Sequence, residues 1–470
     1  YKPVEPPVGK ESLYATQFKN LPIGQMEEKF ADYGEVQIKQ LNDRSKMYYT
    51  PNKENNVFQL IVQYGAGERE FPKLGYAAQL MNNAGIMGAY EPQELKEELS
   101  KLNATCHVTA DEDNLYIIME GYEATLPQAC QLLSRQILMP KLDEKQLARL
   151  KGSAMGMRQQ RKDNVSILNE ALRQYMLYGE KSDYIKELTD KEIYELQISE
   201  LTGDINRASN YEAKVFFTGT LPFDQVYDIL SKNLPLVANE RPSNSPQAKE
   251  MMPVTENTVY FLPNNDAEQA QIHLYIPMQK ADKKDDVLRS AFNQYFGLDF
   301  TGIVLNEIRE KRSMAYTAYA FVGTQGIAGK ASYLRGYIGT QNDKANDALD
   351  VLMSLVNDMP KNPERIGNIK SYLRQAMLTS HPSFRNKAME LVDLGYRGYT
   401  DDPAKENLPK VDALTFDDIV KFYEENIKGK PYCISIMGNP KDIDLKRLEK
   451  FGKVVKLNER KLFNTKDALF

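Results

Sequence analysis

Histidine is scarce in this chain: among 470 residues only His107, His273 and His381 occur, and no two of them lie at helical spacing. A hydrolytic zinc site usually takes three protein ligands, drawn mainly from histidine. Alternation of polar and apolar residues predicts that His107 and His273 lie on the polar faces of strands. His381 precedes a proline, which favours an extended loop. We therefore interpret all three as ordinary strand or surface residues and expect no metal site in this chain.

Cysteine and basic charge are also limited. Cys106, Cys130 and Cys433 are widely spaced and form no CxxC pair, which predicts neither a disulfide framework nor a thiolate metal site. A net charge of -5 and a pI near 5.6 leave no basic excess to neutralise phosphates, which argues against nucleic-acid binding. No segment approaches the ~18 continuous apolar residues of a membrane helix. We expect a soluble protein without a membrane span, and its compartment stays open.

The chain begins YKPVEPPVGKE, with several prolines, no initiator methionine and no apolar signal core. This composition is typical of a linker. We therefore expect the numbering to begin inside a longer precursor, with any targeting signal upstream of Tyr1.

Internal similarity indicates two related units. The apolar segment 57–64 predicts a strand and is followed by a helix from about Pro72. About 214 residues later, segment 271–278 predicts a strand followed by a helix from about Asp285. This separation is far longer than the period of a solenoid repeat and fits duplicated domains.

Later segments correspond in the same way. In each unit an amphipathic helix stops at a proline, Pro140 or Pro360, and a second long helix begins a few residues on. The sequences LTDKEI at Leu188 and LTFDDI at Leu414 also match, and each threonine is followed by acidic residues that suit a helix N-terminus. The two predicted helices lead into the strands KVFFTG and YCISIMG.

These correspondences predict an α+β fold of two homologous domains, each a mixed β-sheet with helices packed mainly on one face. The predicted divisions are a leader or linker at 1–35, a first domain at 36–236, a proline-rich linker at 237–256, a second domain at 257–460 and a tail at 461–470.

The stretch 305–319, LNEIREKRSMAYTAY, is an apolar helical run that ends at Arg309 and is followed seven residues later by Tyr316. It resembles the substrate-clamping signature of the pitrilysin/insulinase family of zinc peptidases, whose members share a fold of the mitochondrial-processing-peptidase type. In that signature a helix closing in Leu/Ile-Arg-Glu-Lys is followed by a small turn and by an Ala-Tyr that opens a strand. The resemblance implies that Arg309 and Tyr316 bind substrate and reach into the active site of another half of the enzyme.

The first unit resembles the family at the helix that carries the zinc motif His-x-x-Glu-His. Segment 74–85 matches that helix, but Ala78 and Asn82 stand where the two histidines belong, and Met81 stands at the catalytic glutamate. The third metal ligand belongs near 153–160, which contains no acidic residue. Alanine and methionine offer no zinc-binding oxygen or nitrogen, and no base remains to activate a water.

The resemblance therefore implies a C-terminal, non-catalytic half of a zinc-dependent metalloendopeptidase, inactive alone, that closes over peptide substrates. Its partner would be a zinc-bearing catalytic half, in the same precursor or a separate subunit, and this chain itself would hold no cofactor. Two alternatives remain open: a non-enzymatic structural or assembly subunit of the same fold, like the core proteins of the respiratory cytochrome complex, and a stand-alone zinc enzyme with an unrecognised site.

The residues themselves also allow a plainer interpretation of Arg309 and Tyr316, the pair here called the clamp. Arg309 can pair with Glu307 or Glu310 at a solvated helix end, and Tyr316 can be a strand aromatic. Substrate, cleavage preference and oligomeric state are not fixed by the sequence.

Overall fold

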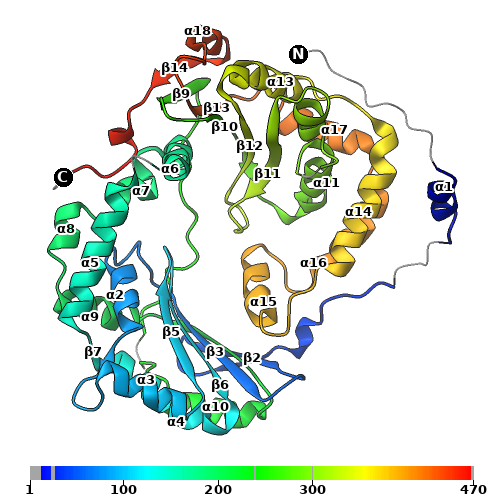
Figure 1. The fold of residues 1–470 in the computed structure, drawn as a ribbon. Coiled ribbons are helices and arrows are strands. Elements are labelled where there is room, and N and C mark those ends of the chain that lie inside the picture. The colour runs from blue at the N-terminus through cyan, green and yellow to red at the C-terminus, as the bar shows by residue number, and fades with distance from the viewer. Residues whose placement is uncertain (1–11, 23–26, 162–163, 238–239, 299, 467–470) are drawn as a thin grey trace.

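Two six-stranded mixed sheets carry the fold of the computed structural model, which describes residues 12–22, 27–161, 164–237, 240–298 and 300–466 (Figure 1). The first sheet runs in the order β1-β2-β8-β3-β6-β5 and the second in the order β11-β12-β10-β13-β9-β14. The strands are β1 (Gln37–Gln40), β2 (Lys46–Pro51), β3 (Val57–Tyr64), β5 (Thr105–Ala110), β6 (Leu115–Tyr122), β8 (Ala213–Gly219), β9 (Thr258–Pro263), β10 (Gln269–Lys280), β11 (Ala315–Thr324), β12 (Ala331–Gln341), β13 (Cys433–Gly438) and β14 (Lys453–Lys456). The predicted α+β fold with mixed sheets is confirmed.

Five strands recur in both sheets with the same order and the same polarity. In the first sheet β2 is parallel to β8, and the neighbours β8, β3, β6 and β5 then alternate antiparallel. In the second sheet β9 is parallel to β13, and β13, β10, β12 and β11 alternate in the same way. The sixth strands differ, because β1 runs antiparallel to β2 whereas β14 runs parallel to β9.

The helices follow the order that the sequence predicts. Those of the first half of the chain are α1 (Leu13–Lys19), α2 (Leu74–Met81), α3 (Pro92–Lys101), α4 (Leu126–Leu138), α5 (Glu144–Gln159), α6 (Val165–Tyr178), α7 (Asp183–Lys186), α8 (Asp190–Tyr194), α9 (Ile198–Ala208) and α10 (Phe223–Asn233). Those of the second half are α11 (Asp286–Phe296), α12 (Ile303–Leu305), α13 (Ala345–Asn357), α14 (Ile366–Thr379), α15 (Lys387–Tyr396), α16 (Pro403–Ala413), α17 (Phe416–Asn426) and α18 (Leu445–Leu448). Helix α1 lies within the stretch predicted as a leader.

The two matching threonines do begin helices. The Thr189 hydroxyl accepts a hydrogen bond from the backbone N–H of Glu192 at 3.1 Å, and the Thr415 hydroxyl accepts one from Asp418 at 3.3 Å. In each case the carboxylate accepts the backbone N–H of the threonine in return. This reciprocal capping satisfies two backbone donors that a helix start leaves unpaired.

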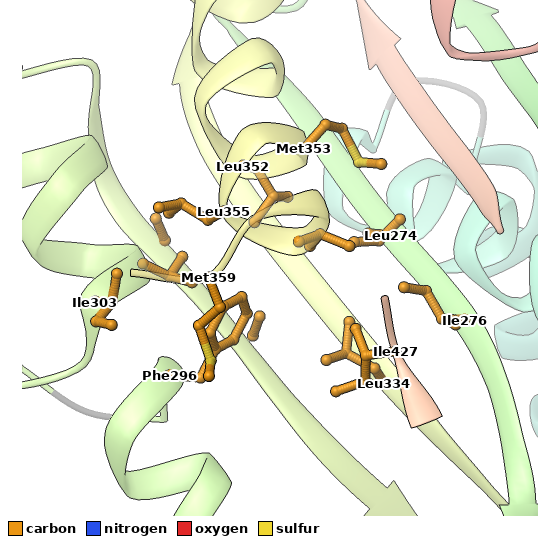
Figure 2. Close-up of a cluster of buried hydrophobic side chains, with 14 of the residues drawn as sticks. Leu274, Ile276, Phe296, Ile303, Leu334, Leu352, Met353, Leu355, Met359 and Ile427 are labelled. Atoms are coloured by element: carbon orange, nitrogen blue, oxygen red, sulfur yellow. The ribbon is translucent and has the colours of Figure 1, made fainter. Parts of the chain in front are cut away.

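Each sheet packs one face against helices of its own half of the chain. In the second sheet, Leu274, Ile276 and Leu334 from the strands meet Leu352 of α13 and Phe296 of α11 (Figure 2). Burying one such side chain contributes about 1.5–3 kcal/mol relative to leaving it exposed. A separate cluster fills the equivalent position beneath the first sheet.

The opposite face of the first sheet is covered by a helix from the second half of the chain. Ala388 of α15 packs against Val36, Ile61 and Phe216, and all four residues are buried. The ammonium of Lys387 pairs with the Glu35 carboxylate at 2.6 Å beside this contact. Figure 1 shows α15 lying over β2 and β3.

The second sheet receives a helix from the first half in return. Leu168 and Leu172 of α6 pack against Leu262 of β9 and Met437 of β13, on the face away from α11 and α13. The helices α6 and α15 each follow the second long helix of their own half, α5 or α14. The two halves of the chain therefore exchange equivalent helices, and each sheet carries helices on both faces.

This exchange changes the setting of one histidine. His273 lies on the polar face of β10, as the sequence predicts, but α6 covers that face and leaves the side chain 2% exposed. Its Nε2 lies 3.0 Å from Asn169 Oδ1 on α6. Burial lowers the pKa of His273 to about 3, and the nearby charges of Arg335 and Arg173 act in the same direction. His107 is exposed on the polar face of β5, as predicted.

Candidate clamp site and the degenerate zinc helix

Arg309 lies at the end of an irregular helix. The short helix α12 continues as a π-helical turn over Asn306–Glu310, in which the N–H of Lys311 donates to the carbonyl of Asn306 at 2.9 Å, five residues earlier. Such turns are rare and occur frequently at functional sites. The sequence predicted the helix end at Arg309 but not its π geometry.

Tyr316 occupies a β-bulge. Ala315 pairs with Thr340 and Thr317 pairs with Gly339, which leaves Tyr316 as an extra residue in β11. The side chains of Tyr316 and Thr317 are both exposed as a result, although they are adjacent in sequence. A bulge of this kind re-aims a side chain, and bulges are over-represented next to active sites.

The two irregular segments bring the predicted pair together. The guanidinium carbon of Arg309 lies 4.9 Å from the ring centroid of Tyr316 and 5.9 Å from that of Phe300. Tyr316 and Phe300 are each 77% exposed, so two largely solvent-exposed aromatic rings lie near the same guanidinium. Ser313, in the turn between Arg309 and Tyr316, has a positive φ of 50°, a conformation that is uncommon for residues other than glycine. Sequence reasoning did not identify Phe300.

Arg309 also makes the plainer contact that the residues allowed. Its Nε lies 3.3 Å from the Glu310 carboxylate. Glu307 is engaged elsewhere, by Lys311 at 3.0 Å and by Arg312. Burial acts to raise the pKa of Glu307, but the hydrogen bonds from Arg312 and Lys311 hold it below its usual range. A partly exposed ion pair such as Arg309–Glu310 contributes only ~0–1 kcal/mol, so it leaves the guanidinium available to another acceptor.

The helix that resembles a zinc helix, α2, is built for packing. Ala78 and Met81 are each 1% exposed and belong to the first core. The Asn82 amide makes a pair of hydrogen bonds, here called a bracket, to the backbone of one residue of the edge strand β5. Its Nδ2 donates to the carbonyl of Val108 at 2.9 Å, and its Oδ1 accepts the Val108 N–H at 2.8 Å. The Asn82 amide, at a position where the resemblance would place a ligand, is therefore hydrogen-bonded to backbone.

The same bracket recurs in the second half of the chain. Asn293 of α11 donates to the carbonyl of Val322 at 3.0 Å and accepts the Val322 N–H at 2.6 Å, on the edge strand β11. The helix after the central strand is thus pinned to the edge strand in both halves by an asparagine. The residues present at Ala78, Met81 and Asn82 do not fit a zinc ion.

Replacing either bracket asparagine should destabilise the fold. Asn82→Ala and Asn293→Ala each leave a backbone N–H and a carbonyl without their partner, which costs about 1–3 kcal/mol where these groups are buried. Chemical denaturation of each variant measures the free energy of unfolding. Gln79→Ala, at an exposed position of the same helix α2, is the matched control and should change little. Wild-type stability in Asn82→Ala would contradict a structural role for this residue.

No group of three or more His, Cys, Asp or Glu side chains is placed to hold a metal ion within the described part of the chain. Among the described residues, no helix is both long enough and apolar enough to cross a membrane.

Comparison with known proteins agrees with this description. Residues 209–369 match the family model of the peptidase M16 inactive domain. A crystal structure of a peptidase M16 inactive domain from Pseudomonas fluorescens is 17% identical, with a TM-score of 0.67 over 87% of this chain and 99% of that one. Residues 209–369 are thus similar to a peptidase M16 inactive domain, in agreement with the resemblance to a non-catalytic peptidase half. The fold of the Pseudomonas fluorescens protein covers most of the length of this chain.

Two larger proteases share the fold. The periplasmic protease PqqL from Escherichia coli is 12% identical with a TM-score of 0.65, and a mutant of the ferredoxin protease FusC in complex with Arabidopsis ferredoxin is 12% identical with a TM-score of 0.67. Each match covers 90% of this chain. The chain spans about half the length of either protease, 50% of PqqL and 49% of FusC. A search of curated protein sequences gave no match.

Proposed function

We propose that this chain is the non-catalytic half of a zinc-dependent metalloendopeptidase, which closes over peptide substrates and supplies Arg309 and Tyr316 to the active site of a zinc-bearing half. The observation that carries the proposal is the placement of Arg309 over the exposed ring of Tyr316, on a π-helical turn and a β-bulge. That the chain spans about half of two proteases of its fold supports a catalytic partner half.

The chemistry of the pair suits amide hydrolysis. Attack on a peptide carbonyl develops negative charge on its oxygen, and donors placed in advance stabilise that charge. A guanidinium and a phenol both stay protonated near neutral pH and both donate hydrogen bonds. Zinc held by the partner half would supply the activated water. In this chain Arg309 and Tyr316 would hold the carbonyl oxygen.

The proposal includes the predicted division of the chain. We assign residues 36–236 and 257–460 to two domains that arose by duplication, joined by the proline-rich segment 237–256. The shared order of five strands and the paired asparagine brackets support this history. In the first domain, α2 would be the descendant of a zinc helix that lost its ligands at Ala78 and Asn82.

The purified chain alone should bind no stoichiometric zinc and cleave no peptide. Its degenerate positions are an alanine, a methionine and an amide already bonded to Val108, so no ligand set exists there. Metal analysis after exposure to zinc and dialysis, together with a peptide-digestion assay, tests this expectation. One tightly bound zinc per chain, lost on substitution within α2, would make this half catalytic and the proposal wrong.

A further inference from the structure

The clamp lies at one end of an aromatic strip on the second sheet. The strip comprises Tyr316, Tyr319 and Phe321 of β11 and Tyr337 of β12. The ring centroids of Tyr319 and Phe321 are 6.0 Å apart, and those of Tyr319 and Tyr337 are 5.3 Å apart. Apart from the exposed Tyr316, these rings are half-buried, and the alternate residues Ala318 and Ala320 point into the core instead.

The strip lies beside the exchanged helix and is not covered by it along β11. The ring centroids of Tyr337 and His273 are 5.1 Å apart, and His273 lies under α6. The helix α6 packs against β10 and β13, in the middle of the sheet, whereas β11 is the edge strand. Part of the polar face of this sheet therefore stays open beside the clamp.

Arg335 is a half-buried cation on the polar face of this sheet. It lies on β12 between Tyr333 and Tyr337, is the pairing partner of Phe321, and alternates onto the same face as the strip. Among the described residues no acidic side chain pairs with Arg335, and its buried Nε has no hydrogen-bond partner. The nearby Arg173 differs, because its guanidinium is paired with Glu170.

An arginine without a counter-ion beside aromatic rings is suited to one kind of ligand group. A guanidinium binds a carboxylate with two parallel hydrogen bonds, and the rings offer contact area to apolar side chains. Arg335 lies close enough to His273 that its charge lowers the pKa of the histidine, after the larger effect of burial. Acidic side chains are therefore favoured at this point over basic ones.

We infer that the aromatic strip and Arg335 form a binding surface for an extended peptide segment that carries an acidic side chain, with Arg335 holding its carboxylate. This inference rests on the proposed function, because it extends the peptide path from Arg309 and Tyr316 along β11.

The register of the acidic side chain follows from strand geometry. Tyr316 and Phe321 are five positions apart on β11, and Arg335 lies opposite Phe321. At ~3.3 Å per residue this is roughly 13–16 Å, the length of about four to five residues of extended peptide. A substrate of the assembled enzyme would carry its acidic residue about four to five positions from the bond held at the clamp.

The complete chain offers a clean binding assay because it contains no tryptophan. The probe is a capped twelve-residue peptide with one tryptophan and one glutamate, otherwise uncharged, and its tryptophan anisotropy is titrated with the chain. A second peptide carries glutamine in place of the glutamate. We expect the glutamate peptide to bind about 10- to 100-fold more tightly, the usual span for a hydrogen bond between charged groups.

Variants of the chain complete the test. Arg335→Gln should weaken the glutamate peptide by the same factor and leave the glutamine peptide unchanged, while the melting temperature shows that the variant is folded. Lys330→Gln, an exposed cation at the end of the same hairpin, is the matched control and should bind like the wild type. No detectable binding of either peptide, or equal binding of both by wild type and Arg335→Gln, would overturn the inference. Neither result depends on turnover, so the clamp is judged separately.

Discussion

Tyr316→Phe should lower kcat/KM for peptide cleavage by about 10²–10³-fold when the chain is assembled with the proposed zinc-bearing half, the usual cost of losing one donor to a developing oxyanion. Arg309→Ala should lower it by a similar factor. Neither change should lower the melting temperature, since the Tyr316 side chain is exposed and Arg309 contributes only a solvated ion pair to the fold.

The lysine variant separates charge from geometry. Arg309→Lys keeps a positive charge near the Tyr316 ring but loses the planar fork of the guanidinium, so it should not restore full activity. Tyr372→Phe, at another exposed tyrosine on α14, is the matched control for loss of a phenol hydroxyl and should retain full turnover.

Steady-state kinetics and thermal melts of each variant make the comparison, with zinc content measured in parallel. Full activity in both Tyr316→Phe and Arg309→Ala, with zinc still bound, would reduce the pair to structural residues. In that case the non-enzymatic assembly subunit becomes the better account of this chain.

Local features of this fold are readable from the sequence because their causes are local. The threonines at 189 and 415, followed by acidic residues, begin helices, and the apolar run 57–64 forms a buried strand. The bulge at Tyr316 was not readable in this way, because the core positions of Ala315, Ala318 and Ala320, which are out of phase by one residue, are known only from the structure.

Other features depend on contacts distant in sequence. Nothing near His273 indicates that α6, about 100 residues earlier, will bury it. The role of Asn82 was equally hidden, because its partner Val108 lies on another element. The sequence predicted that Ala78, Met81 and Asn82 stand where a zinc site would place two ligands and a base, and only the structure showed that Asn82 binds the backbone of Val108 instead. The π-helical turn at 306–310 has no sequence signal that we recognise.

The helix exchange leads to a prediction about the two halves of the chain. Expressed alone, fragment 27–256 should fail to form a soluble, cooperatively folded protein, and so should fragment 257–470. Without α15 the first sheet exposes Ile61 and Phe216, which are 9% and 4% exposed in the complete chain. Each large apolar side chain left in water forfeits about 1.5–3 kcal/mol, and an exposed apolar sheet face also favours aggregation.

Co-expression of the two fragments should restore a soluble complex with the helix content of the intact chain, because the exchanged helices then find their sheets. The intact chain should melt in a single transition. Size-exclusion chromatography, circular dichroism and calorimetry of the fragments, alone and together, test this. A point variant within the intact chain gives an independent measure: Phe216→Ala should lower the free energy of unfolding by about 3–5 kcal/mol. Two soluble fragments that each unfold cooperatively would mean that neither half needs the exchanged helix in order to fold. The halves would then be independent domains.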